Sequence, residues 1–196
     1  GHSDVFATDT YVSREDPPYD TLAGFYAWLA AQPEAIAQFN HPFGPPYDTG
    51  FDHFAYDAAA AQKMALLEVG NGSGEEYHTF EEAYLRALAI GWRVGASNNG
   101  DTEMPDWGLD TPHRTGIVAP SLTRNDLLAA LRARRTFATE DSNLALALRS
   151  GGQWMGSTVS PTATIAFSVD FYDPDGEAIT LELFDRSILV AATSVS

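Results

Sequence analysis

The sequence predicts a mixed α/β fold in two parts, a series of β/α units followed by a small antiparallel β module. Up to about residue 140, short apolar strands alternate with stretches whose apolar residues recur every three or four positions. Beyond that point apolar residues recur every second position between turn signals, which is typical of antiparallel strands. We therefore place a domain boundary near residue 142, giving domains 1–141 and 142–196.

The first part begins with a predicted helix over residues 20–32. Leu22, Phe25 and Leu29 follow the 3.6-residue period, and Pro33 ends the pattern. The remaining elements predicted here are a strand at 35–40, a loop at 43–54, a short helix at 57–64, a strand at 65–69, a helix from a Thr79–Glu82 capping box to Gly91, strands at 92–96 and 115–119, and a helix capped by Thr123. This alternation favours parallel β/α units.

The second part predicts strands at 144–148, 165–171, 179–183 and 188–192. The sequence Asp-Pro-Asp-Gly at 173–176 is a turn signal between two of them. The pattern predicts a sandwich-like module. Because about fifty residues make a thin sandwich, we expect this module to lean on the first part or on further chain.

Charge excludes several function classes. The chain has 196 residues, with 27 Asp and Glu against 11 Lys and Arg, a formal net charge of −16. This balance argues against nucleic-acid binding through a basic patch and against a polybasic membrane surface. No apolar run is long enough to predict a membrane span. The absence of cysteine excludes disulfides and thiolate zinc sites.

Polar residues follow three predicted strands of the first part. These segments are Asn40-His41, Glu68 to Asn71, and Asn98 to Glu103. In parallel β/α folds the ends of strands carry the functional groups, and a His, an Asp and a Glu offer nitrogen and oxygen ligands for a divalent metal. Two plainer interpretations stay open: His41 hydrogen-bonds in a turn before Pro42, and Asn-Gly-Asp is ordinary turn chemistry.

The order of these segments resembles the PHP (polymerase and histidinol phosphatase) superfamily of metal-dependent phosphoesterases, in its carbaryl hydrolase-like branch. The matching pieces are Gly1 to Phe6, Phe39-Asn40-His41-Pro42, Leu67 to Gly72, Gly91 to Val94, Asn99 to Glu103, Trp107-Gly108, Arg114-Thr115-Gly116, Leu127 to Thr139, and Gly151 to Gly156. The first of these pieces favours His2 as a native residue rather than part of a tag.

The resemblance implies the C-terminal part of a distorted β/α barrel of the PHP type, with two or three divalent metal ions (Mn, Zn or Fe). His2, His41 and Asp101 match ligand positions of the family, and Glu103 stands where the family has a histidine. Arg114 lies near the implied site and is expected to contact a phosphate oxygen, with a structural salt bridge as the alternative. We expect His2, His41 and Asp101 to converge on one rim.

The family's His-x-His motif and its further ligands lie upstream of its Gly-His segment and have no counterpart in these 196 residues. The sequence therefore predicts part of a metal-dependent hydrolase that cleaves small phosphoesters with metal-activated water and is inactive alone. Half a barrel exposes a strand edge, so we expect its missing N-terminal half or a second copy to cover it. The β-rich end and the lack of cysteine favour an extracytoplasmic bacterial enzyme.

The alternative prediction is a non-catalytic module that binds a ligand or protein on a degenerate barrel. Its recognition surface is then formed by aromatic residues of the loops, namely Tyr47, Phe51, Phe54 and Trp107. Upstream sequence with a His-x-His segment discriminates between the two, because the enzyme needs those ligands and the binding module does not.

Overall fold

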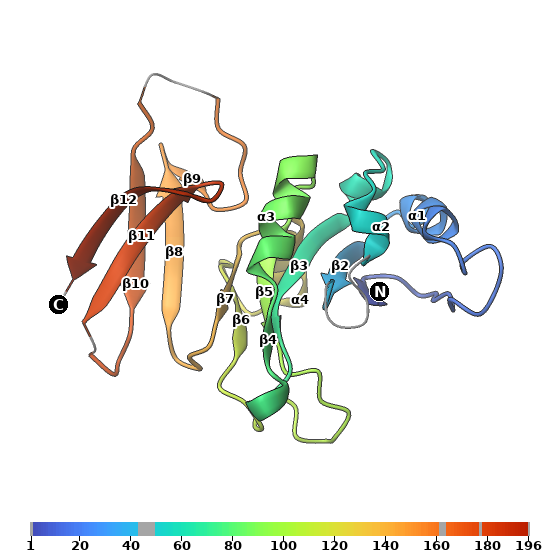
Figure 1. Ribbon diagram of the computed structural model, residues 1–196, viewed down its shortest axis with the longest axis horizontal. Helices are drawn as coiled ribbons and strands as arrows, with labels where there is room; N and C mark the ends of the chain where they lie inside the picture. Colours follow the sequence, from blue (N-terminus) through green and yellow to red (C-terminus); the bar gives the residue numbers. More distant parts are fainter. Residues whose placement is uncertain (1, 43–49, 161–163, 177, 196) are drawn as a thin grey trace.

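The computed structural model describes residues 2–42, 50–160, 164–176 and 178–195 (Figure 1). The fold is mixed α/β, as predicted, with several small sheets and few helices. The described strands form sheets of five, three, two and two strands and close no barrel. The barrel of the PHP type is therefore not confirmed. No helix in the described ranges combines the length and apolar character needed to cross a membrane.

The five-stranded sheet positions the candidate site. It contains β1 (His2–Phe6), β2 (Ile36–Asn40), β3 (Met64–Asn71), β4 (His78–Thr79) and β5 (Gly95–Asn99). Strands β2 and β5 run parallel to β3, one along each edge, and β4 pairs antiparallel with the last two residues of β3. Strand β1 runs antiparallel to β2, so the β/α pattern is not parallel throughout.

Two further strands and the longer helices surround this sheet. Strands β6 (Arg114–Ile117) and β7 (Thr136–Thr139) pair antiparallel and are connected through α4 (Arg124–Arg132). The fourth strand was expected to be parallel, and this expectation is wrong, because β6 pairs with β7 rather than extending the parallel set. Figure 1 shows α3 (Glu81–Ile90) over the central sheet, with α1 (Leu22–Ala31) at the far end from the C-terminus.

Helix ends follow the predicted capping chemistry in part. Thr21 and Thr123 cap α1 and α4, each accepting a hydrogen bond from a backbone N–H of the first turn. Gly91 ends α3 with φ of 118°, a conformation that glycine adopts without strain. The capping box at Thr79 is wrong: Thr79 lies in β4, and Phe80 occupies the N-cap position without a side-chain hydrogen bond.

Three local predictions of the first part differ from the structure. The predicted helix at 57–64 is only the 3₁₀ turn η1 (Ala60–Gln62), and the strand predicted at 92–96 begins at residue 95. Within the predicted loop, residues 43–49 lie outside the described residues, and α2 (Phe51–Phe54) is one turn with positive φ throughout. A second 3₁₀ turn, η2 (Gly74–Glu76), follows β3.

An aromatic cluster forms the centre of the main core. Phe39 of β2 is fully buried, and its ring makes edge-to-face contacts with Phe51, Phe54 and Trp92 at centroid distances of 4.6, 5.2 and 5.1 Å. The Trp92 indole N–H donates to the Phe54 carbonyl at 2.9 Å. This contact holds the α2 turn against the sheet. Trp92 is thus buried in this core, and β5 begins only after it, at Gly95.

The C-terminal part consists of antiparallel strands, as predicted. Its strands are β8 (Ala145–Ser150), β9 (Gln153–Trp154), β10 (Phe167–Tyr172), β11 (Ile179–Asp185) and β12 (Ile188–Val195). They form one sheet in the order β10-β8-β9 and one hairpin, β11-β12, which fits a sandwich-like module. In Figure 1 this module stands beside the first part at the C-terminal end of the molecule.

The module contacts the first part through two hydrogen bonds from one side chain. The Arg134 guanidinium donates both to the Gly156 carbonyl, at 3.1 and 3.2 Å. These contacts agree with a thin module that leans on its neighbour. The boundary near residue 142 stays a prediction.

The aromatic cluster generates a stability prediction. Replacing Phe39 with alanine leaves a cavity between three aromatic rings, so the variant Phe39→Ala should lose about 3–5 kcal/mol of unfolding free energy. The control Tyr11→Ala removes a side chain that is 90% exposed and should change stability by less than about 0.5 kcal/mol. Urea unfolding followed by tryptophan fluorescence measures both. Equal losses in the two variants would contradict the placement of Phe39.

Candidate functional site

The candidate site lies at the edge of the central sheet where β2, β3 and β5 end. Parallel strands place their C-terminal ends at a common edge, which brings His41, Asn71 and Asn99 to the same side. Strand β1 runs the other way, and its first residue, His2, pairs in register with Asn40. His2 therefore reaches this edge from the start of a strand, not from the end of one as the sequence predicted.

The two histidines are in direct contact. His2 Nδ1 and His41 Nε2 are 3.2 Å apart, and the rings meet edge to face with centroids 4.9 Å apart. At this distance one ring nitrogen donates a hydrogen bond to the other, and the tautomers of the two histidines decide which is the donor. Burial, followed by the neighbouring His41, lowers the pKa of His2 below its ordinary value. Both factors favour the neutral imidazole, the form that binds metals.

Glu68 connects the strand ends beneath the histidines. Its side chain is 2% exposed, and its two oxygens accept hydrogen bonds from the His41 backbone N–H, from Asn71 at 3.1 Å and from Asn99 at 2.6 Å. Burial raises the pKa of Glu68, while the hydrogen bonds from Asn99, His41 and Asn71 oppose that rise. The register between β3 and β5 shifts beside it, between Glu68 and Gly70. Such irregularities redirect side chains next to sites.

The sequence placed Glu68 in a candidate strand-end segment but not among the predicted ligands. The signal that could have found it is a single carboxylate inside the apolar run from Met64 to Val69. A buried strand tolerates such a group only where donors satisfy it. Donors from three segments satisfy the hydrogen-bonding capacity of Glu68, so its side chain connects these segments at the edge of the sheet.

Asp101 lies near the histidine pair, whereas Glu103 is exposed in the loop that follows. Asp101 follows β5 directly, has φ of 52°, and lies close enough to His2 for its negative charge to favour the protonated imidazole. Glu103 is exposed and forms no hydrogen bond or ion pair with any other residue that the structure describes. The structure thus brings His2, His41 and Asp101 to one edge and leaves Glu103 in the solvent-facing loop beyond it.

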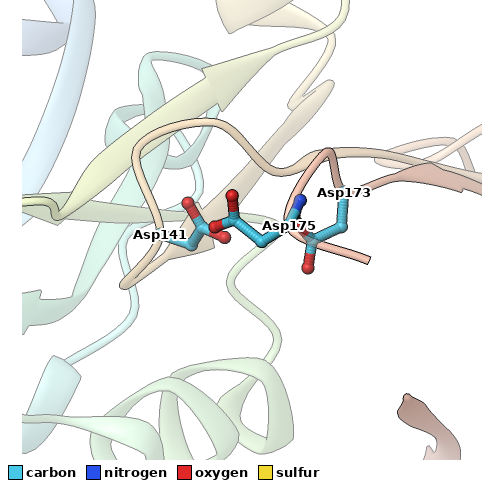
Figure 2. Close-up of side chains that lie close together, drawn as sticks. All are labelled: Asp141, Asp173 and Asp175. Carbon is cyan, nitrogen blue, oxygen red and sulfur yellow. Dashed lines mark hydrogen bonds between the residues drawn. The ribbon is translucent and has the colours of Figure 1, made fainter. Parts of the chain in front are cut away.

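The described residues form no complete metal cage at this edge. Within the described ranges, the His, Asp and Glu side chains here place no three ligand atoms within 4.8 Å of one another. The group that meets this distance is Asp141, Asp173 and Asp175, at the junction of the two parts and in the turn before β11 (Figure 2). These three carboxylates are partly or fully exposed, and such surface groups are common without an ion. They support no metal site on their own.

Arg114 lines the cleft beside Glu68, Asn99 and Asp101, and its side chain contacts its own loop. Its guanidinium donates to the backbone carbonyls of Gly108, Thr111 and His113, each at 2.7 Å. The structural salt bridge is wrong, because Arg114 has no carboxylate within 4.0 Å in the described part of the chain. These hydrogen bonds tie the loop before β6 to the Arg114 side chain. Contact with a phosphate oxygen stays a prediction.

Two clefts lie next to the candidate site. One, of about 480 Å³, is lined mainly by polar residues, which include Asn40, Glu68, Asn99, Asp101 and Arg114, together with Trp107. The other, of about 530 Å³, begins at His2 and extends along the start of α1. Both volumes fall in the range of small-molecule sites.

The aromatic recognition surface of the alternative prediction does not form as proposed. Phe51 and Phe54 are buried in the core, where they pack against Phe39, so this part of the prediction is wrong. The sequence did not show that α2 folds inward. Trp107 is 74% exposed on the rim of the polar cleft, and Tyr47 lies outside the described residues.

Comparisons with known proteins leave the family open: no family model, no curated protein and no solved structure matches this chain. The resemblance to the PHP superfamily therefore stays a prediction based on its ordered motifs.

The position of Glu68 predicts an asymmetric response to mutation. Glu68→Ala leaves three buried donors without an acceptor, so unfolding free energy should fall by about 3 kcal/mol or more. Glu68→Gln keeps one acceptor oxygen and should lose clearly less. Glu75→Ala removes an exposed carboxylate and serves as the control. Urea unfolding at pH 7 measures all three. Equal effects of Glu68→Ala and Glu75→Ala would show that Glu68 does not hold the strand ends together.

Proposed function

We propose that this chain is part of a metal-dependent hydrolase for small phosphoesters and supplies ligands to its metal site. The observation that carries the proposal is the spacing of the two imidazole nitrogens. Two nitrogens about 2.0–2.1 Å from one tetrahedral zinc ion lie about 3.3 Å apart. His2 Nδ1 and His41 Nε2, from segments 39 residues apart, are 3.2 Å apart.

The surrounding residues fit this role. Glu68 binds the His41 backbone N–H, which orients the segment that carries the imidazole. Hydrogen bonds that orient ligand-bearing segments are typical of metal sites. Asp101 adds a carboxylate at the same edge, and a hard cation accepts such an oxygen ligand. The described donors thus fit one divalent cation held by two imidazoles, with Asp101 as the nearest candidate for a third ligand.

The proposed reaction is hydrolysis, in which a water oxygen bonds to phosphorus, the bond from phosphorus to the ester oxygen breaks, and the alcohol leaves with a proton. A bound divalent ion would lower the pKa of the water molecule bound to it and would neutralise negative charge in the transition state. A site of two or three ions (Mn, Zn or Fe) needs more ligands than the described residues of this edge provide. In this proposal they come from the N-terminal half of a barrel of the PHP type or from a second copy of the chain.

A second candidate function is a non-catalytic ligand-binding module. It is favoured by Trp107, which exposes 74% of its surface beside a polar cleft, and by the absence of a three-ligand group at the described part of this edge. An exposed aromatic face next to amide and carboxylate groups suits ligand recognition without chemistry. Metal binding that requires the histidine pair discriminates between the hydrolase and the binding module, because the binding module does not depend on that pair.

The metal site is tested by calorimetric titration of the full chain with Zn²⁺ and Mn²⁺. We expect one site whose affinity falls at least tenfold in His41→Ala, since one of two imidazole ligands is removed. His78→Ala is the control, because His78 is exposed on β4 and is not part of the His2–His41 contact. Metal binding that is the same in both variants would overturn the proposal and point to other carboxylates.

The incomplete ligand set also predicts that the chain alone does not turn over a generic phosphodiester in the presence of Mn²⁺, Zn²⁺ or Fe²⁺. Hydrolysis should appear only when the complementary ligands are added. Metal-dependent turnover by the chain alone, lost in His41→Ala, would contradict the incomplete site while keeping the hydrolase assignment.

A further inference from the structure

The cleft that begins at His2 has an apolar wall and no function in the metal chemistry described above. Leu22 and Phe25 from the first turn of α1 form one side, and Phe51 of α2 forms another. Phe51 is 7% exposed and packs against Phe39, so it connects this wall to the core. A volume of about 530 Å³ accommodates a small molecule with an aromatic ring.

The charged residues of this cleft are Arg14, Asp20 and Asp52. Arg14 is exposed and forms no hydrogen bond or ion pair with another residue in the described ranges. Its guanidinium therefore keeps its donors available, whereas Arg114 directs its donors to three carbonyls of its own loop. A planar guanidinium fork matches two oxygens of a phosphoryl group.

The balance of charge in the cleft depends on the neighbouring metal site. With neutral histidines, two carboxylates outweigh one guanidinium, and the cleft disfavours anions. A divalent ion on the histidine pair reverses the sign at the end where His2 and Arg14 lie. Screening limits these effects to about 10 Å at 0.1 M salt, so the remaining acidic surface contributes little. Anion binding is therefore expected only when the metal is bound.

We propose that this cleft is the substrate subsite for an aryl phosphate ester: Arg14 contacts the phosphoryl oxygens and the wall of Leu22, Phe25 and Phe51 holds the aromatic ring. This inference rests on the proposed function and names its substrate class. It also transfers the phosphate contact from Arg114, which the sequence favoured, to Arg14. The ring lies against aromatic side chains, an arrangement that adds to the burial of apolar area.

The test uses phenylphosphonate, a non-hydrolysable aryl phosphate analogue, titrated into the full chain with saturating Mn²⁺. We expect Arg14→Gln to weaken binding about tenfold, as expected for the loss of a charge-assisted hydrogen bond. Arg124→Gln is the matched control, because Arg124 is exposed at the start of α4 outside the cleft. Phe25→Leu should weaken phenylphosphonate binding and leave methylphosphonate binding unchanged.

Each result decides between the two proposals. If Mn²⁺ does not bind in a His41-dependent manner, the proposed function fails and the subsite fails with it. If Mn²⁺ binds in that manner but Arg14→Gln and Arg124→Gln bind phenylphosphonate equally, only the subsite is overturned. Equal affinity for phenylphosphonate and methylphosphonate overturns the apolar wall. Tighter binding of phenethylamine than of phenylphosphonate shows that Asp20 and Asp52 dominate, and overturns the anion assignment.

Discussion

The candidate site depends on one buried carboxylate. Glu68 accepts hydrogen bonds from the His41 backbone, from Asn71 and from Asn99, which mark the ends of β2, β3 and β5. A single side chain in the middle strand thus fixes three chain segments relative to one another. Backbone pairing aligns these strands along their length, and Glu68 adds side-chain hydrogen bonds at the point where they end and His41 begins the next turn.

Burial of this carboxylate disfavours its charged form, as the raised pKa of Glu68 shows, and its three donors oppose that effect. An apolar residue in its place would avoid this desolvation penalty but would leave the three donors without an acceptor. Its presence instead gives the strand ends directional contacts that apolar packing does not provide. Perturbed carboxylates of this kind concentrate at functional sites, which agrees with a role in holding the histidine pair.

The sequence predicts most elements here, but not how the strands pair. The distribution of apolar residues correctly places α1, β2, β3, α4 and the C-terminal hairpin, because burial determines where those residues fall. The apolar pattern does not show whether neighbouring strands run parallel or antiparallel. The sequence therefore does not predict antiparallel β1 or the β6–β7 pair. Thr79 shows the same limit. It has the sequence pattern of a capping box, but it pairs with Gly70 as part of β4 and does not cap α3.

The two arginines show why site residues are harder to predict than elements. Sequence position favours Arg114, which lies within the ordered motifs, over Arg14, which lies in an irregular segment. Their roles depend on what lies within reach of each guanidinium, and that is set by tertiary structure. The loop before β6 turns three carbonyls toward Arg114, and these satisfy donors that would otherwise bind a ligand. Among the described residues Arg14 forms no such hydrogen bonds, and it lines the cleft beside His2, which is why we propose it rather than Arg114 as the phosphate contact.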